Sequence, residues 1–352
     1  MNEFWIKNFA VFTILILSSK FEECMGKLSK TKTETWFVPQ LDGSMKYMNE
    51  EEAIKANLYI LPMSTFSTIQ HVNPNIFFFL YTEKNMQFGE MIQLNNTYSL
   101  EQSKFDPKYP TRIIIHGWRS RLTSPINQLI CDAYLSVGRY NVIIVDWGTI
   151  ANTINYVKAR YSVPSVALQV ADFIDFLHRE GKMNFSDLIV IGHSLGAHVA
   201  GIAGQEVKTG KIPIIYGLDP AYPLFYYEQI DERLSDDDAE YVETIQTNAG
   251  LLGFKYPIGK TSFFPNWGKV QKGCAFDWNG MCSHRRSYKF FAELIKSNNF
   301  TSNVRCESVD NLLAENCNVR TKNIKMGSES NKVNTEGIYY LDTNSEEPFG
   351  LG

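Results

Sequence analysis

The sequence predicts a protein of the α/β class, with a mostly parallel central sheet and helices on both of its faces. Two patterns support this prediction. Short apolar runs, several of them rich in β-branched residues, alternate along the chain with longer segments whose apolar residues recur at helical spacing. The short runs are apolar throughout, which is typical of parallel strands buried between two layers of helices.

The expected strands and helices follow one another along most of the chain. Strands are expected at 76–81, 111–115, 141–145, 188–191, 212–216, 241–247 and 337–341. Helices are expected at 125–136, 163–179, 195–206 and 285–296. From 27 to 75 the pattern is weak, with short strand-like runs such as 36–38. The polar segment 318–336 is expected to be a loop.

A serine between two glycines joins the strand at 188–191 to the helix at 195–206, in the stretch Gly192-His193-Ser194-Leu195-Gly196. Strand, G-x-S-x-G and helix together are the context of a nucleophile elbow. The two glycines let the strand and the helix pass close to each other around a strained turn. The hydroxyl then lies at a helix N-terminus, where negative charge is stabilised. Ser194 is therefore the candidate nucleophile.

The histidines narrow the choice of a general base. A serine hydroxyl needs a base to accept its proton and a carboxylate to orient that base, and in this class the order along the chain is serine, acid, histidine. Only His198 and His284 follow Ser194. His198 lies one turn along the elbow helix, beside the helix, so His284 is the candidate base. The remaining histidines are interpreted as packing or surface residues: His71, His116, His178 and His193.

The acid is expected at the carboxyl end of a strand beside the elbow strand. Asp219 ends the strand that follows the elbow helix, and Pro220 stops that strand. The run at 236–238 is interpreted as a solvated loop, and Asp277 as an exposed residue between two cysteines. Asp146 precedes the serine, which breaks the order. Asp219 is therefore the candidate acid.

An oxyanion requires backbone N–H donors close to the nucleophile. One donor is expected from Leu195, directly after Ser194. The other is expected from Trp118, after the strand at 111–115, because Gly117 allows the backbone to turn toward the site.

The composition and the N-terminus indicate the compartment. Hydrophobic residues make up 44% of the chain and charged residues 20%, and the net charge of −4 without a basic run argues against a nucleic-acid partner. Lys7 precedes the apolar run 9–17, which is too short to span a bilayer. Residues 1–26 are therefore expected to contain a signal peptide, cleaved between 19 and 26. We expect a secreted, extracellular protein with one domain at 27–352.

Secretion makes the six cysteines candidates for disulfide bonds. Bridges between nearest neighbours are the simplest pairing, and Cys131 is expected to be a buried thiol unless Cys24 is retained and meets it. The expected bridges are Cys274–Cys282 and Cys306–Cys317.

The chain carries three glycosylation sequons and no zinc motif. The sequons predict exposed, glycosylated residues at Asn95, Asn184 and Asn299. The absence of C-x-x-C gives no support to zinc or thioredoxin-type chemistry, so no metal or cofactor is expected.

Four motifs together resemble the animal pancreatic lipase family, and most closely its insect lipases and vespid venom phospholipases. The resemblance runs from about residue 76 to the C-terminus. It implies an α/β-hydrolase fold and hydrolysis of lipid esters, with Ser194, Asp219 and His284 as the catalytic triad. The motifs are Gly192-His193-Ser194-Leu195-Gly196-Ala197-His198, Gly217-Leu218-Asp219-Pro220-Ala221, Phe263-Phe264-Pro265-Asn266 and Cys282-Ser283-His284.

The chain departs from the family pattern in two places. Only 68 residues follow His284, fewer than the roughly 100 of a β-sandwich. We therefore expect no C-terminal β-sandwich domain and no colipase partner. Gln246 stands where many relatives carry a histidine, and we expect this to affect local packing. Some family members are yolk proteins that lost the nucleophile, whereas Ser194 is present here.

In this family, the lid over the site is the disulfide loop before the catalytic histidine, here Ala275-Phe276-Asp277-Trp278-Asn279-Gly280-Met281. Seven residues are too few for a covering helix. A phospholipid, whose polar head stays solvated, suits such a site better than a triacylglycerol. We expect a phospholipase A1 that cleaves the sn-1 ester at a membrane or lipid surface. The alternatives are a triacylglycerol lipase and a non-catalytic, yolk-like lipid-binding protein.

Overall fold

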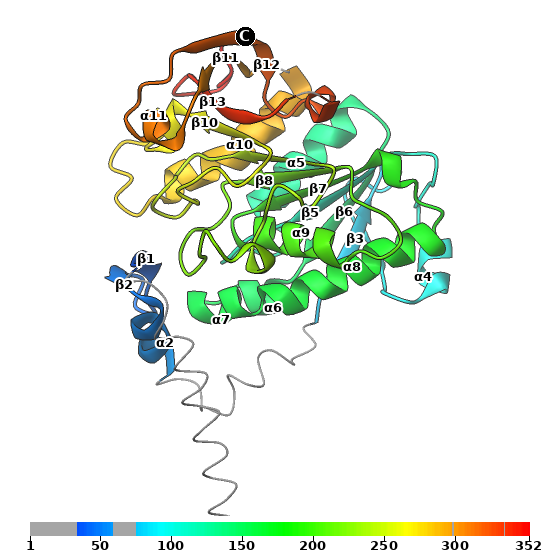
Figure 1. Ribbon diagram of the computed structural model, residues 1–352. Helices are drawn as coiled ribbons and strands as arrows, with labels where there is room; N and C mark the ends of the chain where they lie inside the picture. Colours follow the sequence, from blue (N-terminus) through cyan, green and yellow to red (C-terminus); the bar gives the residue numbers. More distant parts are fainter. Residues whose placement is uncertain (1–33, 59–74, 298, 334) are drawn as a thin grey trace, which may run out of the picture.

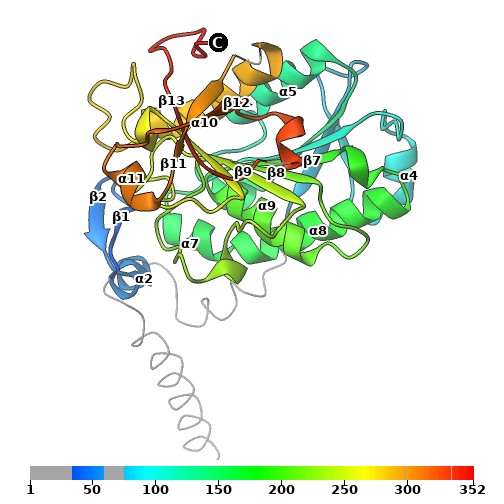
Figure 2. The ribbon, with the colours of Figure 1, turned by 45° about the horizontal axis from the view of Figure 1, so that its top comes forward.

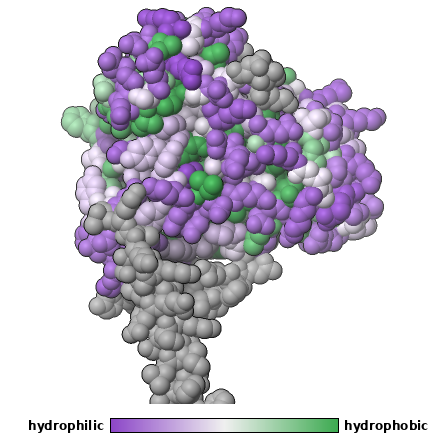
Figure 3. Space-filling model, viewed as in Figure 1, coloured by the Kyte–Doolittle hydropathy of each residue, from purple (hydrophilic) through white to green (hydrophobic). Residues whose placement is uncertain are grey.

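The computed structural model describes residues 34–58, 75–297, 299–333 and 335–352. The expected signal peptide, Cys24 and His71 lie outside the described residues. No helix in the described part of the chain is long and apolar enough to cross a membrane. On the face shown in Figure 3, hydrophilic residues cover most of the surface and apolar residues form small, separate patches.

An 11-stranded, mostly parallel sheet is the centre of the fold and confirms the predicted class (Figure 1). Seven neighbouring strands, from β13 through β10, β9, β8, β7 and β5 to β6, run parallel. The pairs at both edges are antiparallel. In order across the sheet the strands are β12 (Val319–Lys325), β11 (Thr301–Cys306), β13 (Gly337–Leu341), β10 (Thr261–Pro265), β9 (Tyr241–Ile245), β8 (Ile214–Leu218), β7 (Leu188–His193), β5 (Thr111–Ile115), β6 (Asn141–Asp146), β3 (Phe77–Tyr81) and β4 (Glu90–Ile92).

Helices cover both faces of the sheet, and each face has its own core (Figure 1). On one face lie α8 (Val163–Arg179) and α9 (Leu195–Glu206); on the other lie α5 (Pro125–Val137) and α10 (Met281–Ser297). Within β7, Val190 belongs to the first core, whereas Ile189 and Ile191 belong to the second. Successive side chains of a strand point to opposite faces, so a run that is apolar throughout serves both cores.

The remaining elements are short and lie around the sheet. They are β1 (Trp36–Pro39), β2 (Met45–Met48), α2 (Glu50–Leu58), α4 (Thr97–Glu101), α6 (Gly148–Ala151), α7 (Tyr156–Tyr161), α11 (Val309–Leu313) and the 3₁₀ turns η1 (Phe185–Asp187), η2 (Ile230–Glu232), η3 (Asn266–Gly268) and η4 (Glu329–Val333).

The N-terminal segment, where the sequence pattern is weak, forms the β1–β2 hairpin and the helix α2 beside α7 (Figure 2). Trp36 is buried and packs edge-on against Tyr226, with ring centroids 4.8 Å apart. The Tyr226 hydroxyl donates a hydrogen bond of 3.0 Å to Glu50. Tyr226 lies 190 positions from Trp36 and 176 positions from Glu50 in the sequence, which explains why local periodicity did not predict this unit.

The prediction of a loop at 318–336 is wrong, because β12 and η4 occupy most of this segment. β12 pairs with β11 at the edge of the sheet, where backbone hydrogen bonds hold a strand whose side chains are largely polar. Inside, the buried Glu243 accepts hydrogen bonds from the backbone of Gly327 (2.5 Å) and from Asn331 (3.1 Å). A side chain of β9 thus anchors the polar segment.

The prediction of a solvated acidic run at 236–238 is wrong for Asp238, whose side chain is only 2% exposed. It accepts hydrogen bonds from Gln205 (2.8 Å) and from the backbone of Ser235 (2.7 Å). Burial raises the pKa of Asp238 to about 7; Asp237 adds to the rise, whereas the two hydrogen bonds and Arg233 oppose it. Asp237 itself is exposed.

We expect Asp238 to make the protein less stable as the pH rises. The pKa of this carboxyl in the folded chain lies above its usual value of 3.8, so its protonation favours the folded state below about pH 7. The free energy of unfolding of Asp238→Asn minus that of the wild type should increase between pH 4 and pH 8, by at most about 4 kcal/mol. Urea unfolding measures this, with Asp172→Asn, an exposed aspartate on α8, as the matched control. A pH-independent difference would contradict the expectation.

The close passage of α9 against the end of β5 should make Gly196 intolerant of a side chain. A Cβ at this position would lie 2.2 Å from the carbonyl oxygen of Ile115, which is backbone and cannot move aside. Gly196→Ala should lower the free energy of unfolding by about 2 kcal/mol or more. Gly138→Ala is the control, because there a Cβ meets only the ring of Tyr140. Equal urea midpoints for the two variants would contradict this reasoning.

Candidate active site

Ser194 lies on a strained turn between β7 and α9. Its backbone has φ 58° and ψ −123°, which is unusual for a residue with a side chain. Hydrogen bonds on both sides hold the turn: the Ser194 N–H donates to the Leu218 carbonyl (3.1 Å), and the Ala221 N–H donates to the Ser194 carbonyl (3.2 Å). Contacts with the end of β8 and with the loop after it therefore hold the backbone of Ser194 in its strained conformation.

Glycines make room for this turn. A Cβ on Gly192 would lie 2.2 Å from the carbonyl oxygen of Gly196, so only glycine fits at the end of the strand. A Cβ on Gly117 would lie 2.6 Å from the Ser194 Cβ, which places the backbone after β5 directly against the serine. Trp118, whose N–H is the expected oxyanion donor, follows Gly117 at this point. Leu195, the other expected donor, begins α9.

A short hydrogen bond joins His284 to Asp219. The His284 Nδ1 and the Asp219 Oδ2 are 2.6 Å apart, and both side chains are buried. The second carboxylate oxygen, Oδ1, accepts backbone N–H groups from Thr247 (2.7 Å) and Asn248 (3.0 Å). Asp219 comes directly after β8, which runs two residues further than expected. Because Nδ1 of His284 is bonded to Asp219, its other ring nitrogen, Nε2, is the one available for a proton transfer.

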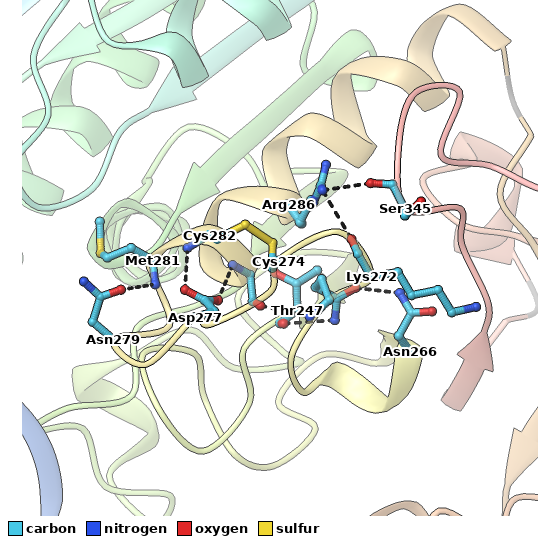
Figure 4. The surroundings of a disulfide bond; sticks show 12 residues. Thr247, Asn266, Lys272, Cys274, Asp277, Asn279, Met281, Cys282, Arg286 and Ser345 are labelled. Carbon is cyan, nitrogen blue, oxygen red and sulfur yellow. Dashed lines mark hydrogen bonds between the residues drawn. A yellow bond between two sulfur atoms is a disulfide. The ribbon is translucent and has the colours of Figure 1, made fainter.

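His284 lies in the first turn of α10, which begins four residues earlier than predicted. Asp277 is half-buried instead of exposed, and it accepts the backbone N–H groups of Cys282 (3.0 Å) and Ser283 (2.7 Å) at this helix end (Figure 4). The disulfide between Cys274 and Cys282 closes the same loop. The loop and its cap therefore fix the start of the helix that carries His284.

His193 brings the elbow and α10 together. Its ring centroid lies 4.6 Å from that of His284, and its Nε2 is 3.3 Å from the His284 carbonyl oxygen. Burial, and then the neighbouring His284, hold the pKa of His193 well below its usual range, so this ring is neutral. His193 is the residue directly before Ser194, so this contact places His284 beside the elbow.

The other buried histidines have structural partners. The His198 Nε2 lies 2.7 Å from the Ala221 carbonyl oxygen, and its Nδ1 accepts the Leu234 N–H (3.0 Å). Burial lowers the pKa of His198 to about 3. The His116 Nε2 lies 3.2 Å from the Asp146 carboxylate. These contacts agree with packing roles for both histidines.

The disulfide loop presents two aromatic side chains to solvent. Residues 275–280 lie outside any helix, and Met281 is the first residue of α10. The side chain of Phe276 is 98% exposed and that of Trp278 is 69% exposed. Neither side chain therefore contributes to a hydrophobic core.

Gln246 links the site to the loop between β9 and β10. Its amide nitrogen donates to the carbonyl oxygens of Phe254 (2.9 Å) and Tyr256 (2.8 Å), and its oxygen accepts from Thr244 (2.9 Å). The sequence singled out Gln246 only as a departure from a family pattern. These contacts hold the 254–256 segment, whose Phe254 N–H donates to the Pro220 carbonyl (2.7 Å) directly after Asp219.

The other cysteines and the sequons also have defined surroundings. A second disulfide joins Cys306 to Cys317, and Cys131 is a buried free thiol whose pKa burial raises to about 12. Among the described residues, the group of potential metal ligands within reach of one ion comprises Cys274, Asp277 and Cys282, and the sulfurs of the two cysteines are already joined to each other.

Two of the three sequon residues, Asn95 and Asn184, are exposed as predicted. The third, Asn299, is half-buried.

Comparison with known proteins gives a consistent result. The chain is 38% identical over 195 residues to Phospholipase A1 4 of Polistes dominula; the aligned region covers 52% of this chain and 60% of that protein. It is 32% identical to Lipase member H of Oryctolagus cuniculus, over 70% of this chain and 54% of that one. It is also 32% identical to Pancreatic triacylglycerol lipase of Myocastor coypus, over 75% of this chain and 61% of that one.

The alignments with these three relatives therefore span only 54–61% of their own length. The model of the Lipase family, by contrast, matches residues 46–349, which is most of the present chain and includes the elbow, Asp219 and His284. The chain belongs to the lipase family.

Proposed function

We propose that this protein is a secreted serine hydrolase of lipid esters that acts as a phospholipase A1. The observation that supports it most is the Asp219–His284 hydrogen bond of 2.6 Å beside a serine on a strained, glycine-flanked turn. A buried histidine oriented by a carboxylate next to an elbow serine is the arrangement that activates an alcohol for acyl transfer.

In this mechanism, Ser194 Oγ attacks the carbonyl carbon of the ester while His284 Nε2 accepts the hydroxyl proton. Asp219 holds the ring in orientation and stabilises the imidazolium. The backbone N–H groups of Leu195 and Trp118 donate to the oxyanion. The C–O bond to the glycerol breaks as His284 returns the proton to the leaving oxygen. Water then repeats the sequence on the acyl-serine and releases the fatty acid.

The short disulfide loop favours a phospholipid over a triacylglycerol. Residues 275–280 form no helix, so the site needs no opening step before a lipid enters. The exposed Phe276 and Trp278 are suited to contact a lipid surface, and no colipase is invoked. The chain is 38% identical over 195 residues to the relative named Phospholipase A1 4, and 32% identical over 286 residues to the triacylglycerol lipase. Cleavage at the sn-1 ester releases a fatty acid and a lysophospholipid.

Two other functions remain as alternatives to this proposal. A triacylglycerol lipase would use the same chemistry on a neutral lipid, as the relative from Myocastor coypus does by its name. A non-catalytic, yolk-like binding protein would not need an activated serine, and the retained Ser194, Asp219 and His284 argue against it.

Secretion, a signal peptide before residue 27 and a single domain at 27–352 are parts of the same proposal. Two disulfides are typical of an oxidising compartment, and Asn95 and Asn184 are exposed acceptors for glycans. The chemistry requires no cofactor or metal.

We expect Ser194→Ala to lower hydrolysis of phosphatidylcholine vesicles at least about a thousandfold, because the nucleophile is lost. Secretion and thermal stability should be retained. The control is Ser136→Ala, an exposed serine on α5. Labelling with a fluorophosphonate should occur in the wild type and the control only. Retained activity in Ser194→Ala would show that Ser194 is not the nucleophile. A wild type that acts faster on triacylglycerol emulsion than on phosphatidylcholine vesicles would favour the triacylglycerol lipase instead.

Replacing 275–281 with a longer, amphipathic segment of about 20 residues should shift the preference toward triacylglycerol. A segment of this length forms several helical turns and can cover the acyl pocket with its apolar face. The measurement is the ratio of initial rates on triacylglycerol emulsion and on phosphatidylcholine vesicles. The matched control is a polar insertion of equal length. An unchanged ratio would show that this loop does not determine the lipid class.

A further inference from the structure

A turn at 248–253, after β9, covers the carboxylate of the candidate acid. A Cβ on Gly253 would lie 2.3 Å from Oδ1 and 2.5 Å from Oδ2 of Asp219, so the backbone of the turn is packed directly against both carboxylate oxygens. The Leu252 carbonyl accepts the N–H of Tyr222, at a distance of 2.8 Å. The turn is therefore attached to the segment that follows Asp219.

Asn248 closes this turn with both its backbone and its side chain. Its N–H donates to Asp219 Oδ1 (3.0 Å), and its carbonyl accepts the Gly253 N–H (3.0 Å). Its side-chain Oδ1 accepts the Leu252 N–H (3.0 Å). Asn248 is only 3% exposed, so loss of its side chain would leave a buried N–H without its acceptor and would loosen the turn beside the acid.

The same side chain contacts the start of the helix that carries the candidate base. A Cβ on Gly280 would lie 2.3 Å from the Asn248 Oδ1, so the backbone at the end of the disulfide loop rests on the amide. The Gly280 carbonyl in turn accepts the His284 N–H (2.9 Å). Gln271 donates to the Thr247 carbonyl (3.0 Å), which brings the residue before Asn248 beside this loop (Figure 4).

We propose that Asn248 is a positioning residue that sets Asp219 and His284 relative to each other. Its N–H holds the acid, and its amide supports the residue from which the first turn of α10 begins. This inference rests on the proposed ester hydrolysis by Ser194 and deepens it, because it makes the disulfide loop part of the support of the triad. A misplacement of about 1 Å in a catalytic group can cost about a hundredfold in rate.

The first test is Asn248→Ala, with kcat and KM measured for the full chain on the soluble ester p-nitrophenyl butyrate. The value of kcat should fall at least about tenfold while KM changes less than about twofold, because the imidazole is no longer held in line with Ser194. If this variant does not fold, Asn248→Ser, which keeps a shorter acceptor, takes its place and should show a smaller loss of kcat.

The matched control is Asn141→Ala. Asn141 is also buried, and its side-chain oxygen accepts a backbone N–H, that of Asp106 (3.0 Å). It lies at the start of β6, at the opposite end of the parallel strands from the triad. The control should lower the free energy of unfolding and keep the wild-type kcat.

A double-mutant cycle tests the contact between the loop and the amide. Gly280→Ala places a Cβ against the Asn248 Oδ1 and should lower kcat on the same ester. This loss should be at least about threefold smaller when Asn248 is already alanine, because the oxygen that the Cβ meets is then absent. The strain of alanine at the φ of 72° of residue 280 is the same in both backgrounds and cancels. Equal losses would contradict the contact.

A proton NMR spectrum of the Ser194→Ala protein separates this inference from the proposed activity, because it requires no turnover. The proton in the 2.6 Å bond between His284 and Asp219 should resonate far downfield. Asn248→Ala in the same background should shift or broaden this signal, whereas Asn141→Ala should not.

The outcomes distinguish the two proposals. If the wild type hydrolyses neither the soluble ester nor a phospholipid, the proposed function fails, while the downfield signal still decides the role of Asn248. An unchanged kcat in folded Asn248→Ala, or a downfield signal that does not depend on Asn248, would overturn the positioning role.

Discussion

The hydrogen bond between Asp219 and His284 is the interaction on which the site depends. It joins the end of β8 to the first turn of α10 across 65 positions of sequence. A fully buried carboxylate is costly unless its oxygens are paired, and here Thr247 and Asn248 satisfy the second oxygen. Three separate segments, namely the end of β8, the residues after β9 and the start of α10, must therefore be folded before this carboxylate is stable. The same contacts that hold the fold together at this point also orient the imidazole.

The parallel sheet explains why these groups meet at all. Parallel strands end at one edge of the sheet, so the residues after β5, β7, β8 and β9 are neighbours although they are far apart in sequence. Gly117, Ser194 and Asp219 follow three of these strand ends. The close approaches at Gly117 and Gly192 show how little space remains there. The elbow is thus a property of the packing of β5, β7 and α9, and its strained backbone depends on that packing.

The outer segments are attached to this rigid centre by side-chain hydrogen bonds. The disulfide loop leads into α10 through the cap formed by Asp277, and Gln246 attaches the 254–256 segment to β9. The exposed side chains of Phe276 and Trp278 lie in the first of these two loops. Loops held on a rigid scaffold can vary without loss of the core, which is why substrate choice is expected to reside in them.

The α/β class, the lipase family and the strand–turn–helix around Ser194 could be predicted from the sequence, because buried strands and the G-x-S-x-G turn leave a local pattern. Other features depend on contacts that form only in the folded chain. β12 is polar and is held as an edge strand by backbone hydrogen bonds, and Asp238 lies in an acidic run yet is buried by Gln205 and Ser235. The hairpin at Trp36 packs on Tyr226, and the start of α10 depends on Asp277. In each case a partner outside the local periodicity sets the burial or the pairing, and periodicity describes only a segment's own faces.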